Sequence, residues 1–306
     1  AARPLWAGLN WYTHGMTKRV QAFLQLVRPK DYFFFVLATS LLGIAAAQGE
    51  FGLRFVLVCA ANFFASSFTF IFNQLADAPA DTFRQKKSAP NPIAQGSISA
   101  SEAALTALAA AVLSLALFWL LDWRLLFVGL VLLGFGLLYS ERGTRVHGIS
   151  MLDLAGHSWL LAPALSLSGY LAFQPRFTTE LLFLFLTVIF LSLLGEITHE
   201  RSSLKALKEA PARQTVLNIS ARAVHFLVIA CASAALLSGI ILFFFLRVLP
   251  LRAAIFVLVC GGILLIPGLF RSNREPTRLP LHIPLEKAVA LGLLVEFLTS
   301  FLIRWL

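Results

Sequence analysis

The stretch FNQLADAPADTFRQKKSAPNPIAQGSIS, Phe72 to Ser99, carries most of the information about the fold of this chain. It follows a long apolar run and places Asp77 and Asp81 four residues apart, ahead of a group of basic residues and a turn region with Pro and Gly. Residues four apart share one face of a helix. The sequence therefore predicts two neighbouring carboxylates at the end of a helix of membrane-spanning length.

The composition of the whole chain agrees with a membrane protein. The chain has 306 residues, of which 58% are hydrophobic and 13% are charged. Soluble domains average about 25% charged residues, so this chain has too little polar surface to coat a soluble globule. Because backbone groups inside a bilayer must be satisfied within a helix, we predict an all-α, multi-pass membrane helix bundle. The net charge of +10 indicates loops that face anionic membrane lipids, and the sequence has no nucleic-acid-binding motif.

Apolar runs divide the chain into candidate membrane spans. We predict an amphipathic cytoplasmic segment over residues 1–31 and a nine-helix transmembrane domain over 32–306, with cytoplasmic loops at 77–101 and 198–222. The nine runs are Tyr32–Ala47, Leu53–Leu75, Ala103–Leu121, Leu125–Tyr139, Leu152–Phe173, Leu181–Leu194, Val224–Phe245, Ala253–Phe270 and Ala288–Leu306.

The distribution of Lys and Arg predicts the orientation in the membrane. Nineteen of the 25 basic residues fall on one side of the predicted spans, and six fall on the other. Cytoplasmic loops carry such an excess, so we expect a cytoplasmic N-terminus and, after nine spans, a C-terminus outside. The six basic residues on the outer side are Arg54, Arg124, Arg176, Arg247, Arg252 and Arg304.

Asn73 extends the carboxylate pair by one more helical turn. Mg²⁺ is commonly held by one or two carboxylates together with substrate phosphate oxygens, so this stripe is a candidate diphosphate site. The alternative is a solvated helix end with basic side chains that reach toward water. The basic residues that could neutralise a phosphate are Arg84, Lys86 and Lys87.

These residues resemble the intramembrane prenyltransferases of the UbiA superfamily. The resemblance rests on Asn73-x-x-x-Asp77-x-x-x-Asp81, the bases and PIAQGSIS (Pro92 to Ser99), and VRPKDYFFFVLATSLLG (Val27 to Gly43) is similar to the start of the family's first helix. The resemblance implies nine transmembrane helices with aspartate motifs on two cytoplasmic loops. It also implies Mg²⁺-dependent transfer of an isoprenoid chain from its diphosphate to an aromatic or other acceptor, with Asp77 and Asp81 as metal ligands.

The first motif departs from the family pattern at three places. Gln74 stands where the family usually has Asp, and Pro90-Asn91 precede Pro92 where an Arg is usual. Pro79 lies between the two aspartates, where it removes a backbone donor and tends to kink a helix. We therefore expect an altered site that still binds phosphate.

The second motif of the resemblance falls within GEITHERSSLKALKEAPARQT, Gly195 to Thr215. One register places Ser203, Leu207 and Pro211 at its ligand positions, and the other places Leu204, Lys208 and Ala212 there, so neither supplies a carboxylate. A shifted register would use Glu196 and Glu200, with His199 between them, as catalytic carboxylates. The alternative is a hydrogen-bonded polar cluster at the membrane interface.

Other polar residues lie within apolar runs. Asp153 and His157 are four residues apart, so they form either a structural pair or a functional one. We expect Asn62 to make hydrogen bonds between helices, and Glu296 to have a partner on another helix.

Two functional hypotheses follow from these residues. The first is a UbiA-like protein with a degraded catalytic site, acting as a structural or isoprenoid-, quinone- or pigment-binding subunit of a larger respiratory or photosynthetic membrane complex. The second is an active, divergent Mg²⁺-dependent prenyltransferase that uses Asp77, Asp81, Glu196 and Glu200. A transporter is a weaker third hypothesis, because the spans show no repeat.

Overall fold

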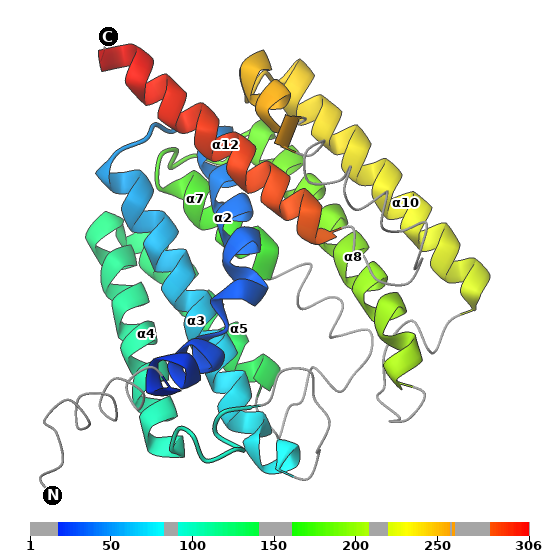
Figure 1. Ribbon diagram of the computed structural model, residues 1–306. Coiled ribbons are helices and arrows are strands. Elements are labelled where there is room, and N and C mark those ends of the chain that lie inside the picture. The colour runs from blue at the N-terminus through cyan, green and yellow to red at the C-terminus, as the bar shows by residue number, and fades with distance from the viewer. Residues whose placement is uncertain are drawn as a thin grey trace, which may run out of the picture.

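The computed structural model describes residues 18–82, 91–140, 161–207, 220–257, 259–260 and 282–305. These residues form helices and short connections and no strand, which confirms the all-α fold class (Figure 1). A first helix covers residues 18–27 and a short one covers 251–257. The others are α2 (Pro29–Ala46), α3 (Leu53–Asp81), α4 (Ala100–Leu121), α5 (Trp123–Ser140), α7 (Ala162–Leu171), α8 (Thr179–Leu207), α10 (Ala221–Ile240), the π-helical η3 (Ile241–Phe245) and α12 (His282–Trp305).

Six helices in the described residues are long and apolar enough to cross a membrane, and each coincides with a predicted run. The other three runs give no such helix there. α7 has only ten residues, the run Ala253–Phe270 lies largely outside the described residues, and α12 is not among the six. The predicted count of nine spans is therefore not confirmed. The six are Pro29–Ala46, Leu53–Asp81, Ala100–Leu121, Trp123–Ser140, Thr179–Ile197 and Arg222–Phe245.

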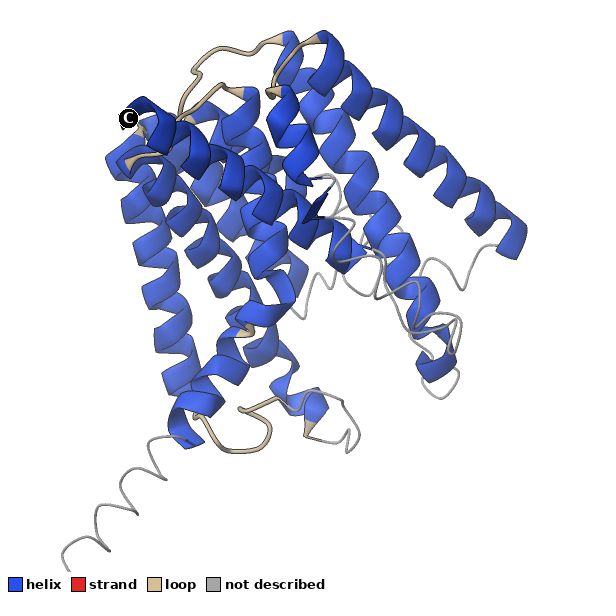
Figure 2. Cartoon of the chain, turned by 45° about the horizontal axis from the view of Figure 1, so that its top comes forward, coloured by secondary structure: helices blue, strands red, loops and turns tan. Residues whose placement is uncertain are grey.

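α3 lies at the centre of one group of helices, because it packs against α2, α4, α5 and α7. α8 and α10 lie side by side next to this group, and α12 crosses α2 and reaches α8 (Figures 1 and 2). α3 and α8 run in the same direction, so their C-terminal ends lie on the same side of the molecule (Figure 1). Which side faces the cytoplasm stays a prediction of the Lys and Arg count.

α2 and α7 pack backbone to backbone. A Cβ atom at Gly43 would lie 2.0 Å from the carbonyl oxygen of Ser166, and one at Gly169 would lie 2.4 Å from that of Ser40. Small residues at such crossings are typical of helix packing inside membranes. Any larger side chain at either glycine would push the two helices apart.

Asn62 joins three helices at this crossing. Its Nδ2 donates to Ser40 Oγ on α2 (2.7 Å) and to the Leu165 carbonyl on α7 (3.1 Å), and its Oδ1 accepts from Ser168 Oγ (2.7 Å). All four residues are buried away from water, so these hydrogen bonds supply the partners that their polar groups need. The predicted helix-packing role of Asn62 is confirmed.

Two helices extend beyond the ends that the sequence predicts. α3 runs through Asp81, so the first five residues of the predicted loop 77–101 are helical. α8 runs to Leu207, well into the predicted loop 198–222, and α10 begins at Ala221. Both motifs thus begin on helices, which hold their side chains at fixed angular positions.

Candidate functional site

Asn73, Asp77 and Asp81 lie on one face of α3. The helix continues past Pro79, which is exposed, and ends where the backbone N–H and Oγ1 of Thr82 both donate to the Ala78 carbonyl. All three polar side chains are half-buried, whereas Gln74 and Ala78, beside them on the helix, are buried. Pro79 does not end the helix before Asp81, so both carboxylates keep the helical spacing of four.

Asn91 connects the returning chain to the end of α3. This buried side chain donates from Nδ2 to the Gln74 carbonyl (2.8 Å) and to Asp81 Oδ2 (3.3 Å). Its Oδ1 accepts from the backbone N–H of Ile93 (3.0 Å). Asn91 therefore both closes the turn that follows and fixes one oxygen of Asp81. The sequence analysis treated Asn91 only as a departure from the family pattern and missed this role.

Gln74 attaches the N-terminal helix to α3. Its Nε2 donates to the carbonyls of Gln25 (2.8 Å) and Leu26 (3.2 Å), at the end of the helix over residues 18–27. Asp77 and Asp81 follow Gln74 by three and seven residues, so Gln74 lies beside them on α3 while its amide group is bound to the N-terminal helix. The expectation that Gln74 in place of Asp alters the carboxylate site stays a prediction.

A capping box fixes the start of α4 on the same side of the molecule. Ser99 Oγ accepts from the backbone N–H of Glu102 (3.2 Å), and the backbone N–H of Ser99 donates to Glu102 Oε2 (2.9 Å). Glu102 also forms an ion pair with Arg19 Nη2 (2.5 Å). The hydrogen bonds from Ser99, with a smaller contribution from Arg19, hold the pKa of Glu102 below its ordinary value.

The second cluster brings together two carboxylates that are far apart in the sequence. Glu196, on α8, is half-buried, and Glu286, near the start of α12, lies within its electrostatic range. Glu286 precedes the predicted span Ala288–Leu306. Burial and, to a smaller extent, the Glu196 carboxylate raise the pKa of Glu286 to about 7, against the opposing effect of Lys287. The sequence analysis missed Glu286, although an acidic residue directly before an apolar run is a recognisable signal.

Several predicted site residues lie outside the part of the chain whose side chains are described. Glu200 and His199 belong to α8 by their backbone, and their side chains lie outside the described part. The other predicted site residues outside the described part of the chain are Arg84, Lys86, Lys87, Asp153 and His157.

The α3 carboxylates suit one Mg²⁺ held jointly with a ligand. Among the described residues, no group of three or more His, Cys, Asp or Glu side chains could hold a metal ion by itself. Mg²⁺ keeps several waters and needs only one or two carboxylates when substrate phosphates complete its shell. Asp77 and Asp81, half-buried on one face, meet that requirement.

The fold and this site can now be compared with known proteins. The sequence profile of the UbiA prenyltransferase family matches residues 36–280. The chain belongs to this family. Among solved structures, a UbiA homologue from Archaeoglobus fulgidus bound to DMAPP and Mg²⁺ is similar, with a TM-score of 0.66 and 19% identity over 89% of this chain and 98% of that one.

Two further structures share the UbiA fold of this chain. The apo structure of a UbiA homologue from Aeropyrum pernix K1 has a TM-score of 0.66 and 14% identity over 87% of this chain and 98% of that one. A digeranylgeranylglyceryl phosphate synthase has a TM-score of 0.64 and 17% identity over 92% and 99% of the two chains. No curated protein matches the sequence. At these identities the likeness establishes the fold, and the site has to be argued from its own residues.

Proposed function

We propose that this UbiA-family membrane protein binds an isoprenoid diphosphate together with Mg²⁺ at the C-terminal end of α3. The observation that supports this most is the half-buried pair Asp77 and Asp81 on one helical face, with Asp81 fixed by Asn91. Asn73 extends the same face by a turn and offers an amide to a phosphate oxygen. The A. fulgidus homologue binds DMAPP with Mg²⁺, which is the chemistry proposed for this chain.

Prenyl transfer by this chain is proposed to be weak or absent. Mg²⁺, when bound, neutralises the charge that develops on a diphosphate leaving group. The positions of the second family motif hold Ser203 and Leu207, or Leu204 and Lys208, which provide no carboxylate for a further metal. We therefore propose a degraded catalytic site in a structural or isoprenoid-, quinone- or pigment-binding subunit of a larger membrane complex.

One observation favours a second candidate, an active prenyltransferase, which is a transferase of alkyl groups other than methyl. The Glu196 carboxylate on α8 contributes to the raised pKa of Glu286 on α12, so two carboxylates lie near each other there. Together with Glu200 they would form a displaced second acidic cluster. Two carboxylates whose charges repel attract a cation, which is the property that a second metal site requires.

Binding and transfer are measured separately on the purified protein. Labelled geranyl diphosphate is titrated with Mg²⁺ and with EDTA, and then incubated with a panel of aromatic acceptors. We expect Mg²⁺-dependent binding without product. Robust transfer that is lost in both Glu196→Gln and Glu286→Gln would overturn the degraded site in favour of the second candidate. Binding unaffected by EDTA would overturn the metal site.

The proposed place in a larger complex has its own test. The protein is extracted in a mild detergent and its co-purifying proteins and pigments or quinones are identified. We expect a partner at a fixed molar ratio. A protein that elutes alone, with no bound isoprenoid compound, would contradict this part of the proposal and leave the diphosphate result unaffected.

A further inference from the structure

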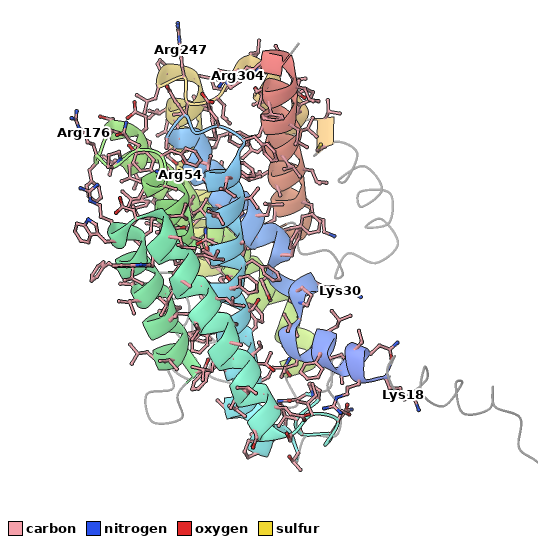
Figure 3. The ribbon with its side chains drawn as sticks, turned by 90° about the vertical axis from the view of Figure 1, so that its left-hand side faces the viewer. Lys18, Lys30, Arg54, Arg176, Arg247 and Arg304 are labelled. Atoms are coloured by element: carbon pink, nitrogen blue, oxygen red, sulfur yellow. The ribbon has the colours of Figure 1, made fainter. Side chains whose placement is uncertain are left out.

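A cavity of about 380 Å³ lies at the opposite end of the bundle from Asp77 and Asp81. The turn between α2 and α3, residues 247–252 and the last turns of α12 line it. Figure 3 shows Arg54, Arg176, Arg247 and Arg304 toward this end, and Lys18 and Lys30 farther down the molecule. The volume is in the range of small-ligand sites, which is about 300–1,000 Å³.

Glu296 is the buried polar group in the wall of this cavity. It is 4% exposed, and its Oε1 accepts from Arg252 Nε (2.7 Å) and from Ser300 Oγ (2.8 Å). Arg252 Nη2 also donates to Ser300 Oγ (2.6 Å), which closes a three-membered network and supplies the interhelical partner expected for Glu296. The other oxygen, Oε2, is buried and has no hydrogen-bond partner among the described residues. A buried acceptor left without a donor destabilises the fold unless a ligand supplies that donor.

The cations around the cavity exceed its carboxylates by one. Arg304 pairs with Glu50, and Arg252 pairs with Glu296. Arg247 also lines the cavity and forms no ion pair within the described residues. Its backbone has a φ of 53°, a left-handed conformation that is uncommon for a residue other than Gly and places this exposed side chain at the rim. The site therefore attracts an anion that also carries a hydrogen-bond donor for Glu296 Oε2.

Apolar surface surrounds the charged residues of the cavity. Val248 and Phe297 are buried and contribute apolar wall. Outside, at the end of η3 and the start of the next helix, Phe244, Phe245 and Leu251 are 63%, 76% and 71% exposed. In a membrane protein such side chains contact acyl chains. A ligand with a charged head and apolar tails matches both surfaces, and a soluble phosphate ester matches only one.

We propose that this cavity binds the headgroup of a phospholipid that carries an N–H or O–H donor beyond its phosphate, as phosphoethanolamine does. The phosphate contacts Arg247 and Arg304, and the amine donates to Glu296 Oε2. A phosphoglycerol headgroup offers hydroxyl donors at the same place, whereas phosphocholine has none. This lipid site is independent of the diphosphate site and of the proposed function.

The test compares headgroups on one acyl background. Delipidated protein is reconstituted with equal amounts of phosphatidylethanolamine, phosphatidylglycerol and phosphatidylcholine, and the retained lipids are counted by native mass spectrometry. We expect both donor-bearing lipids to be retained about tenfold over phosphatidylcholine, the ratio that one charge-assisted hydrogen bond gives. Equal retention of all three would overturn the proposal, because it would mean that water satisfies Oε2.

Three variants assign the effect to the cavity. Glu296→Gln places an amide donor where the ligand's donor should bind, so the preference for donor-bearing lipids should fall below about twofold. Arg247→Gln, an exposed change that spares the fold, should lower retention of all phospholipids while preserving their ratio. Arg176→Gln is the matched control on the same end of the bundle and should change nothing. A preference that survives both cavity variants would overturn the site.

A competition experiment identifies the source of the headgroup. Glycerophosphoethanolamine, which is the same headgroup without acyl chains, is added to protein loaded with phosphatidylethanolamine. We expect it to displace the lipid only at more than about a hundredfold excess, because it lacks the apolar contacts. Displacement at equal concentration would overturn the lipid as ligand.

Discussion

The ends of α3 and α8 both carry carboxylates, but they hold them in different ways. At α3, Asp77 and Asp81 lie on one helix, and Asn91 donates a hydrogen bond to Asp81. At α8, Glu196 meets Glu286 from a different helix, and burial with this second charge raises the pKa of Glu286 to about 7. A donor that fixes a carboxylate preserves its charge for a ligand. Two half-buried carboxylates brought together instead favour a proton or a cation between them.

Removing the α3 charges is the most direct test of the difference between the two carboxylate pairs. Asp77→Asn together with Asp81→Asn should weaken Mg²⁺-dependent diphosphate binding by at least about 100-fold, because both metal ligands are lost. Calorimetry with geranyl diphosphate measures this. Asp122→Asn, at the C-terminal end of α4 on the opposite side of the bundle, is the control and should bind normally. Equal binding by the double variant would show that the pair is only a solvated helix end.

The role of Asn91 is tested by truncation. Asn91→Ala removes a buried amide with bonds to Gln74, Asp81 and Ile93, so the protein should lose about 1–3 kcal/mol of unfolding free energy. Diphosphate affinity should fall several-fold as well, since Asp81 loses its fixed orientation. Gln95→Ala, an exposed change in the same turn, serves as control. Loss of stability without loss of affinity would limit Asn91 to a structural role.

Glu286 should make stability depend on pH. Its pKa is raised in the folded protein, so the folded state binds more protons than the unfolded state between about pH 4.5 and 7, and stability falls as the pH rises through that window. Glu286→Gln should therefore stabilise the protein at pH 8 by up to about 3 kcal/mol and have little effect at pH 4.5. Thermal unfolding in detergent at both values measures this. An equal effect at both pH values would mean that the Glu286 carboxylate is solvated in the folded protein.

The smallest effect concerns the capping box of α4. The pKa of Glu102 is lowered in the folded protein, so its contribution is complete above about pH 4.5 and is lost as the pH falls through the lowered value. Glu102→Gln keeps an acceptor for Ser99 but loses the ion pair with Arg19. We expect a decrease in melting temperature of less than about 2 °C, which disappears at high salt. A decrease that persists at high salt would assign the effect to the cap itself.

Local periodicity made the α3 site predictable. The contacts that were not predicted join residues far apart in the sequence, where no periodicity applies. The spacing of Asn73, Asp77 and Asp81 fixes their common face on any helix, and the structure has them on one. The partners of Gln74 could not be predicted because sequence position does not tell which neighbour a buried amide meets. Glu286 could not be paired with Glu196 for the same reason: their approach depends on how α12 crosses the bundle.

The span count shows the same limit at the level of the fold. Six apolar runs predicted long membrane helices, and the structure has them. The run Leu152–Phe173 is described only from residue 161 onward, where the ten-residue α7 packs closely on α2 at Gly43 and Gly169. Hydrophobicity marks a segment that avoids water, but the close approach of two helices depends on small residues that hydropathy does not single out.

The attachment of the N-terminal helix to α3 connects the bilayer to the proposed diphosphate site. The helix over residues 18–27 exposes Val20 and Leu24, each more than half, and ends at the two carbonyls that Gln74 binds. Gln74 lies one turn before Asp77 on the same rigid helix. A change in lateral pressure that moves the N-terminal helix along the bilayer normal is therefore expected to rotate the C-terminal end of α3. Diphosphate affinity measured in thin and thick bilayers would quantify this mechanical coupling, and identical affinities would exclude it.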